Sequence, residues 1–206
     1  MDDFLQALIR NQQICASAAV ESCIDRHAGR NTCDDFFEYW YSTNLVGIEG
    51  ISLGTHSRDL PCAMNEVIRA ECLTPEGCRQ LVIKAWVHPE FPEVNLTRED
   101  WLMAFSRVGY VNDSEEGELA PPEESIQLWR GAIAERKHGM AWTSDKQRAL
   151  WFAKRFNGTS ETNAELWTAE VAAERVLARF MGRGESEYVV NSKGLTVTLE
   201  ESLQGP

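Results

Sequence analysis

The chain has 206 residues, of which 43% are hydrophobic and 25% are charged, and this balance is typical of a folded globular protein. Its 20 Lys and Arg residues and 32 Asp and Glu residues give a formal net charge of −12. An acidic chain is on average repelled by phosphate backbones and by anionic membrane surfaces. The charge therefore disfavours nucleic acid as a partner, although a local basic groove is compatible with any net charge.

The N-terminal sequence MDDFLQALIR carries two aspartates where a secretory signal has Lys or Arg. No segment approaches the run of about 20 apolar residues that crosses a bilayer. These two observations predict a cytoplasmic protein with no membrane partner.

Six cysteines all lie within the first 78 residues. They are Cys15, Cys23, Cys33, Cys62, Cys72 and Cys78. None forms a CxxC pair, and the spacings match no common zinc or disulfide pattern. We therefore expect reduced, partly buried thiols and no metal site.

Residues 1–111 predict a mainly helical region, because their apolar residues recur at helical spacing. Helices are expected at residues 2–27, 34–45, 63–71, 74–86 and 96–105. Pro75 suits the first position of the fourth helix, and Thr97 suits the N-cap of the fifth. The aromatic group at residues 36–41 could form a ligand platform, but packing between helices is the favoured interpretation.

Residues 112–124 read NDSEEGELAPPEE, with six acids, no base and two consecutive prolines, and predict a solvated connector. Residues 125–206 then change to strand patterns with one helix among them. Strands are expected at residues 125–133, 139–145, 164–172, 175–181, 186–190 and 194–200, and a helix at residues 144–156. Ser144 or Asp145 is its expected N-cap. A helix between strands indicates the α+β class.

Three short stretches in residues 125–206 carry candidate chemistry. In LWRG, Arg130 could clamp a phosphate through its fork of donors, and Gly131 could let a ligand or a backbone come close. Alone, Arg130 is more typical of a surface cation packed on an aromatic ring. In GMAWTSD, Thr143 and Ser144 could cap a helix or hold a carboxylate, and Trp142 could offer its ring to a planar ligand.

The third stretch, GESEYVV, places Glu185 and Glu187 one residue apart at the start of a strand. Residues i and i+2 of a strand point to the same face, so the two carboxylates are expected side by side. Such a pair is unfavourable when it is partly buried, unless the two groups have a task. On an exposed strand the pair would be an ordinary acidic edge.

The order of these stretches resembles the R-S-E clade of mono-ADP-ribosyltransferases, the cholera-toxin-like group, over residues 126–206. The resemblance implies a split β-sheet whose cleft binds NAD as co-substrate and an unidentified target protein as acceptor. It implies that Arg130 contacts the NAD pyrophosphate or ribose, and that Gly131 and Trp142 also belong to the NAD site. It further implies that Thr143, with Ser144 behind it, holds the catalytic glutamate or the ribose. Asp145 stands where the family's Ser-Thr-Ser element has its third hydroxyl. A small chain of this kind suits a phage or bacterial effector.

The resemblance further implies that Glu187 is the catalytic glutamate and that Glu185 serves the acceptor, with arginine as the acceptor side chain. The turn before this pair, RFMGRG, is expected to meet the target protein. The chemistry agrees, because a carboxylate against the ribose stabilises the positive charge that develops when the bond to nicotinamide breaks. An NAD glycohydrolase on the same fold, or a catalytically silent binding or inhibitor protein, are the alternatives. The expected boundaries are a helical region at 1–111, a connector at 112–124 and a catalytic domain at 125–206.

Overall fold

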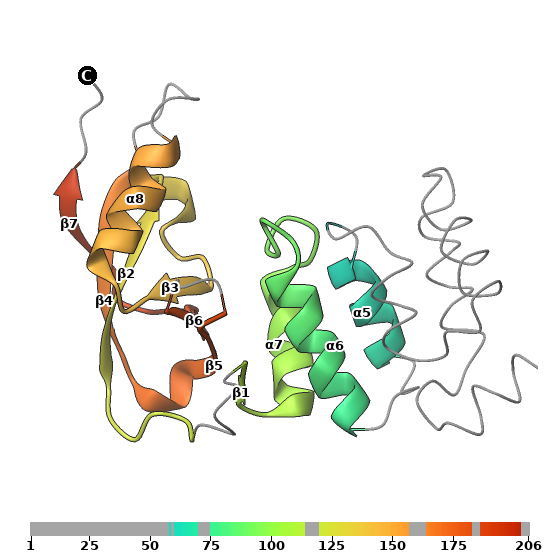
Figure 1. The fold of residues 1–206 in the computed structure, drawn as a ribbon. Coiled ribbons are helices and arrows are strands. Elements are labelled where there is room, and N and C mark those ends of the chain that lie inside the picture. Colours follow the sequence, from blue (N-terminus) through green and yellow to red (C-terminus); the bar gives the residue numbers. More distant parts are fainter. Residues whose placement is uncertain are drawn as a thin grey trace, which may run out of the picture. The chain divides into compact units, whose positions relative to one another are not determined.

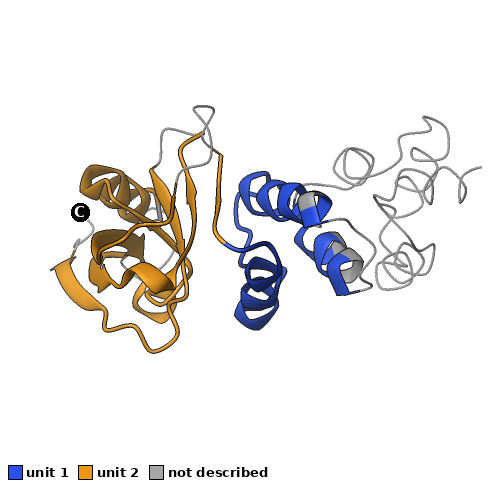
Figure 2. Cartoon of the chain, turned by 90° about the horizontal axis from the view of Figure 1, so that it is seen from below, with its two compact units in different colours: residues 1–109 blue, residues 110–206 orange. Residues whose placement is uncertain are grey.

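The computed structural model describes residues 58, 60–69, 75–113, 120–156, 164–182 and 186–202. The chain divides into two compact units, residues 1–109 and residues 110–206 (Figure 2). The helices expected at residues 2–27 and 34–45, with the aromatic group at 36–41, lie outside the described residues. None of the described helices has the length and apolarity needed to cross a membrane.

The described part of residues 1–109 contains three helices, as the sequence predicts (Figure 1). They are α5 (Leu60–Arg69), α6 (Pro75–Val87) and α7 (Arg98–Val108). The prolines of the segment between α6 and α7 prevent the helix from continuing, because proline lacks the amide that a helix interior requires. The expectation of a helical region is therefore confirmed for these residues.

Local signals in the sequence set the ends of these helices. Pro75 is the first residue of α6, where a missing amide donor is harmless. Thr97 caps α7, and its hydroxyl accepts a hydrogen bond from the amide of Asp100 at 3.2 Å. Gly109 ends α7 with a φ of 70°, which glycine adopts without a steric penalty.

Aromatic side chains form the contact between α6 and α7. The ring centroid of Trp86 lies 4.8 Å from that of Trp101 and 5.8 Å from that of Phe105, both in edge-on geometry. All three side chains are fully buried. Edge-on aromatic pairs contribute about 0.5–1.5 kcal/mol each beyond the area they bury. These rings therefore hold α6 against α7.

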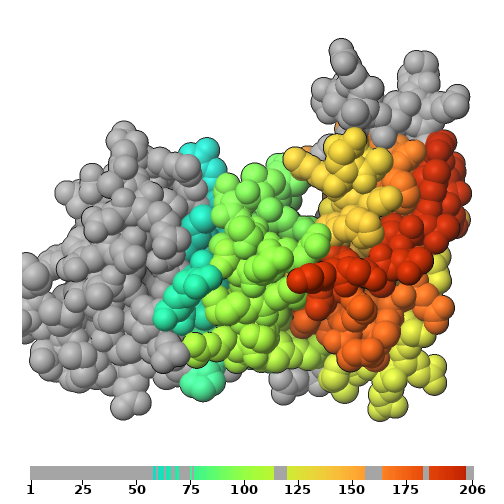
Figure 3. Space-filling view, turned by 180° about the vertical axis from the view of Figure 1, so that it is seen from behind, coloured from blue at the N-terminus to red at the C-terminus, as the bar shows by residue number. Residues whose placement is uncertain are grey.

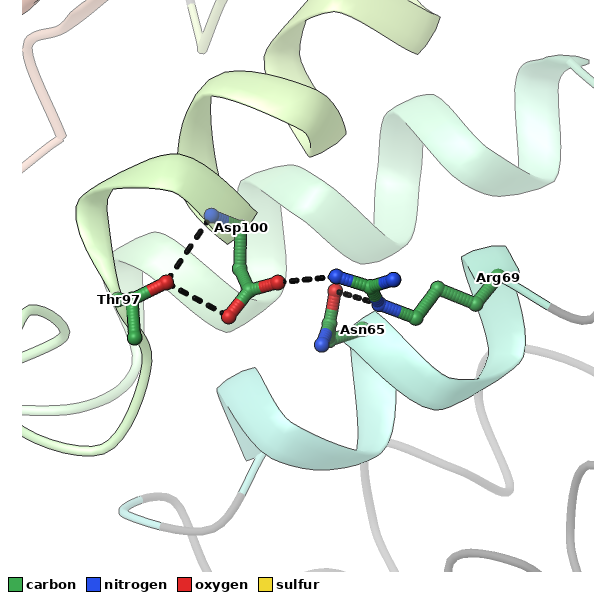
Figure 4. A network of polar contacts seen from close by, with 4 residues as sticks. All are labelled: Asn65, Arg69, Thr97 and Asp100. Carbon is green, nitrogen blue, oxygen red and sulfur yellow. Dashed lines mark hydrogen bonds and ion pairs between the residues drawn. The ribbon is translucent and has the colours of Figure 1, made fainter.

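A polar network joins the end of α5 to the start of α7 (Figure 4). Arg69 forms an ion pair with Asp100 and donates from Nε to Oδ1 of Asn65 at 3.3 Å. The hydroxyl of Thr97 donates to the second carboxylate oxygen of Asp100 at 2.7 Å. Burial raises the pKa of Asp100, but its hydrogen bonds with Thr97, Arg69 and Asn65 and the charge of Arg69 outweigh this effect. The pKa of Asp100 therefore lies below its ordinary value.

The described part of residues 110–206 forms a seven-stranded sheet with the strand order β1-β5-β6-β3-β2-β4-β7. The strands are β1 (Val111–Asn112), β2 (Ile126–Ala132), β3 (Ala141–Thr143), β4 (Glu165–Val171), β5 (Val176–Phe180), β6 (Glu187–Val190) and β7 (Thr198–Ser202). Only the β1–β5 pair is parallel among these strands. With helix α8 (Lys146–Phe156), this confirms the α+β class; the split ADP-ribosyltransferase-like sheet stays a prediction.

The start of the expected connector belongs to this sheet. Val111 and Asn112 form β1, are buried, and pair with Ala178 and Arg179 of β5. The predicted connector at 112–124 is therefore wrong for its first residue, because β1 includes Asn112. A two-residue strand is too short to show an alternation in the sequence. The prolines and acids at residues 120–124 do lie outside helices and strands.

The sheet has two different faces. One face, which we call the core face, carries a buried apolar cluster. Its members are Leu128, Trp142, Ala169, Val171, Val176, Tyr188, Val190 and Leu195. The register sets Leu128 opposite Ala169 and Trp142 opposite Tyr188. Residues of β2 to β6, together with Leu195, thus build this cluster on one face.

Helix α8 packs against β2, β3 and β4 on the other face, which we call the helix face (Figure 1). Gly131 of β2 lies under this helix. An ideal Cβ there would lie 2.1 Å from the carbonyl oxygen of Ala149 and 2.5 Å from the amide nitrogen of Ala153. The close approach expected at Gly131 is therefore observed, and the neighbour is the backbone of α8. The space-filling view shows the orange and red segments, from β4 to β7, packed side by side (Figure 3).

Candidate functional site

Thr143 and Glu187 lie directly opposite each other on the neighbouring strands β3 and β6. Directly opposed residues of an antiparallel pair point to the same face, with Cβ atoms about 4.5–5.5 Å apart. Their neighbours Trp142 and Tyr188 belong to the core face, so Thr143 and Glu187 point to the helix face. Two of the predicted site residues are thus brought together.

This pair extends into a row across the sheet. Trp129 of β2 lies opposite Thr143 on one side and opposite Thr168 of β4 on the other. We call Glu187, Thr143, Trp129 and Thr168 the polar row. It runs along the helix face at the end of β3 from which α8 begins.

The hydroxyl of Thr143 fixes the turn from β3 into α8. It accepts a hydrogen bond from the amide of Asp145 at 3.0 Å, and the Thr143 side chain is almost fully buried. Asp145 then caps α8, because its Oδ1 accepts hydrogen bonds from the amides of Gln147 and Arg148 at 2.8 and 3.1 Å. Of the two expected caps, Asp145 is the one observed. Ser144 is exposed and follows Thr143 in this turn.

Glu187 is half-buried at the first position of β6. Ser186, just before it, has a φ of 44°, in the left-handed region that residues other than glycine rarely adopt. The carbonyl of Ser186 accepts a hydrogen bond from the amide of Ser144 at 3.3 Å. Backbone in this conformation persists where its surroundings hold it, and it is often found at functional sites.

This backbone changes the argument for the Glu185–Glu187 pair. Strand alternation predicts that residues i and i+2 share a face, but β6 begins only at Glu187 and Ser186 is not extended. The alternation used to set the two carboxylates side by side therefore does not apply. Glu185 itself lies outside the described residues.

Arg130 lies on the core face, since it neighbours Trp129 along β2. Its guanidinium donates from Nε to the carbonyl of Arg136 at 3.1 Å and from Nη1 to the carbonyl of Ala141 at 2.5 Å. An ideal Cβ on Gly139 would lie 2.0 Å from Nη2. The guanidinium thus packs inside the loop between β2 and β3, across the sheet from Thr143 and Glu187. The contact of Arg130 with NAD stays a prediction that this geometry does not support.

Trp142 is a core residue with 2% of its surface exposed. Its indole nitrogen donates to the carbonyl of Gly139 at 2.8 Å. The ring therefore faces protein atoms, and the structure gives no support to its expected contact with a planar ligand.

Trp129 is the aromatic residue that the sequence argument passed over. Its half-buried indole donates from Nε1 to Oε2 of Glu200 at 2.6 Å, and Lys146 at the start of α8 forms an ion pair with the same carboxylate. The hydrogen bond from Lys146 lowers the pKa of Glu200 most strongly, and the one from Trp129 adds to this effect. Strand alternation could have identified Trp129 from the sequence. Trp129 and Arg130 are adjacent in β2, so their side chains must point to opposite faces of the sheet.

The described residues contain no group of three possible metal ligands among His, Cys, Asp and Glu. The two described cysteines, Cys62 and Cys78, are half-buried and form no disulfide, in agreement with the expected reduced thiols. Burial raises the pKa of the Cys78 thiol above its ordinary value, and the charge of Arg107 opposes this effect. The other four cysteines lie outside the described residues.

Comparisons of the chain with protein-family models, with curated proteins and with solved structures give no match. The case for a function accordingly depends on the residues of the polar row and on their geometry.

Proposed function

We propose that the protein is a mono-ADP-ribosyltransferase that transfers ADP-ribose from NAD to a protein side chain, with arginine as the acceptor. The observation that carries the proposal is the direct pairing of Thr143 with Glu187, on the strands that the resemblance assigns to the catalytic element. In the reaction the bond between ribose C1′ and the nicotinamide nitrogen breaks, and nicotinamide leaves with the electron pair. A new bond forms from C1′ to a guanidinium nitrogen, which loses a proton.

Glu187 is the proposed catalytic residue. Cleavage of NAD passes through an oxocarbenium-like state, so a carboxylate against the ribose stabilises charge that develops only in the transition state. Half-burial of Glu187 strengthens such an interaction relative to water. Thr143, directly opposite, supplies a hydroxyl beside that carboxylate and restricts its position.

Glu185 is the proposed acceptor residue. A protonated guanidinium is a poor nucleophile, and a carboxylate near it can orient it and take its proton. The left-handed backbone at Ser186 turns the chain between the two glutamates. NAD and a protein are two different substrates, so the proposal gives each of the two carboxylates a task of its own.

The contacts of Arg130 favour a supporting role in this site. Its guanidinium ties the carbonyl of Ala141, the first residue of β3, to the loop before it. Because Thr143 ends this three-residue strand, the position of Thr143 depends on that loop. Gly131 of β2 admits the backbone of α8, the helix that follows Thr143 in the chain.

Incubation of the protein with labelled NAD and a cell lysate tests the proposal. Labelled proteins and free nicotinamide are expected, and Glu187→Gln is expected to lose both products. The matched control is Glu174→Gln, because Glu174 is exposed in a short helix of the same unit, away from the polar row. Loss of the label on treatment with hydroxylamine checks that arginine is the acceptor.

The alternatives make different products in the same assay. Free ADP-ribose without labelled protein identifies an NAD glycohydrolase, in which water takes the place of the acceptor. If neither product forms, both enzymatic proposals are wrong and a catalytically silent binding or inhibitor protein is favoured.

A further inference from the structure

The carboxylate of Asp113 holds the start of the turn between β5 and β6. Its Oδ1 accepts a hydrogen bond from the amide of Met181 at 2.6 Å, and its Oδ2 accepts one from the amide of Gly182 at 2.9 Å. Successive backbone amides form a concavity that suits an anion, and bonds to a charged acceptor are about twice as strong as neutral ones. Both carboxylate oxygens of Asp113 are thus used within the protein.

The position of Asp113 is set by the sheet. Asp113 directly follows β1, whose residues Val111 and Asn112 pair in parallel with Ala178 and Arg179 of β5. This register brings the carboxylate of Asp113 level with the end of β5. Gly182 fits the contact closely, since an ideal Cβ there would lie 2.8 Å from Oδ2 of Asp113. A larger residue at 182 would therefore push the carboxylate away.

The same turn leads directly to Glu187. Phe180, the last residue of β5, lies opposite Glu187, the first residue of β6. The turn therefore connects two residues that are neighbours across the sheet, and one of them is Glu187. Asp113 holds the first end at Met181 and Gly182, and the bond between the Ser144 amide and the Ser186 carbonyl holds the other end. The backbone on either side of the turn is thus fixed by groups from β1 and from β3.

The turn also presents an apolar side chain beside the proposed site. Met181 is 39% exposed, one of the few large hydrophobic side chains exposed among the described residues. A flexible methionine adapts to the surface of another protein and gains free energy when that protein covers it. Water, the acceptor in hydrolysis, gains nothing from such a surface. The exposed Met181 is therefore suited to contact with a protein acceptor.

We propose that Asp113 is a positioning residue for the protein acceptor, acting through the turn at Met181 and Gly182. This inference rests on the proposed transferase function and adds to it the residue that orients the acceptor side of the site. The hydrogen bonds of Asp113 go to Met181 and Gly182 and not to residues of the polar row. Its loss should consequently separate the two reactions, reducing transfer to protein and sparing cleavage of NAD by water.

The test uses the full chain with Asp113→Asn, which keeps the volume and one acceptor oxygen, and with Asp113→Ala. Glu123→Ala is the control, because it removes an exposed acid from the same acidic segment. We expect transfer by Asp113→Ala to fall about tenfold to a hundredfold, since a misplacement of about 1 Å has effects of that size. NAD hydrolysis is expected to stay within about twofold of the wild-type rate, and Asp113→Asn should follow the same direction.

Amide hydrogen exchange gives a second measurement that does not depend on activity. Exchange at Met181 and Gly182 should become faster in both Asp113 variants and stay unchanged in Glu123→Ala. Unchanged exchange, or an equal loss of transfer and hydrolysis in Asp113→Asn, would overturn the role given to Asp113. A wild-type chain that makes neither product contradicts the proposed function and, with it, this role in transfer. Faster exchange in that case would still identify the contact as structural.

Discussion

Thr143 uses its hydroxyl in the turn between β3 and α8 and also lies opposite Glu187. The two roles make different demands on the side chain. The turn needs an oxygen that accepts the Asp145 amide, whereas the site needs that oxygen beside a carboxylate. Serine satisfies the first demand, and valine keeps only the shape of threonine.

We expect Thr143→Val to lower the free energy of unfolding by about 1–1.5 kcal/mol, because the Asp145 amide loses its hydrogen-bond partner in a part-buried turn. Thr143→Ser should stay within about 1 kcal/mol of the wild type. Urea unfolding measures both changes, and NAD cleavage by the folded variants should fall further for valine than for serine. Equal stability of the two variants would show that the hydrogen bond contributes little.

Asp100 predicts a pH dependence for the helices α5 and α7. Its pKa is lower in the folded chain than in the unfolded chain, so the folded state binds fewer protons at mildly acidic pH. The stabilisation is thus present above the unfolded pKa of about 3.9 and is lost as the pH falls through the lower folded value.

Thermal unfolding of the wild type and of Asp100→Asn, from pH 6 down to about pH 2.5, tests this assignment. The wild type should lose more stability than the variant over the acid end of this range. Parallel curves for the two proteins would mean that Asp100 does not contribute to the acid sensitivity.

At the scale of elements, helix α8 packs on β2 at a position where only glycine fits. Gly131→Ala should destabilise the protein by about 1–3 kcal/mol, because the new methyl group meets backbone atoms of α8 that cannot turn aside. Gly139→Ala is the comparison, since its methyl group would meet the guanidinium of Arg130 instead.

Chemical unfolding measures the free energy of unfolding of the two glycine variants. The variant that loses more stability is not expected to be the one that disturbs the Arg130 contacts more. Gly131→Ala is expected to lose more stability, whereas Gly139→Ala displaces the end of a side chain and frees the Ala141 carbonyl. Wild-type stability in Gly131→Ala would show that α8 can shift away from β2 without loss.

Local signals in the sequence predicted most of these elements. Thr97 and Pro75 identify the starts of α7 and α6 because capping and proline effects act within one turn. The strands β2 and β4 to β6 follow from alternation and glycine breaks, and the helix α8 from its N-cap signal at Ser144 or Asp145. Strand β1 was missed, because its two residues gain their structure from pairing with a segment far away in the sequence.

The candidate site was less predictable than the elements around it. Thr143 and Glu187 were recognised by type and order, but their pairing depends on the register of β3 with β6. A shift of one residue reverses the face of every side chain, which is why Arg130, Trp142 and Trp129 could not be assigned to faces in advance. The positive φ of Ser186 likewise has no signal in its residue type.

For the whole molecule, the division at residues 109 and 110 lies close to the expected end of the helical region at residue 111, whereas the catalytic domain was expected to begin at residue 125. A fragment of residues 110–206 keeps β1 and Asp113, whereas a fragment of residues 125–206 lacks both. The other six strands and the core cluster lie within both fragments. The difference in stability between the two fragments therefore measures the contribution of residues 110–124, which include β1 and Asp113.

We expect the 110–206 fragment to fold with cooperative unfolding and the 125–206 fragment to be less stable, because the edge of β5 loses its partner. Circular dichroism with thermal unfolding measures the order of stability. NAD hydrolysis should survive in the longer fragment if residues 1–109 are not needed for it. A shorter fragment as stable as the longer one would place the boundary back near residue 125.

The bonds from Met181 and Gly182 to Asp113 span 68 and 69 positions of the chain. During synthesis the contacts among α5, α6 and α7 become available early, because their partners lie close in sequence. The two hydrogen bonds of Asp113 can form only after the ribosome has released residue 182. Glu187 emerges only a few residues later. A nascent chain therefore exposes the open edge of its sheet for most of the synthesis of residues 110–206. The residues that complete the turn and the carboxylate beside it are made almost together, so a chain that ends before residue 182 lacks both.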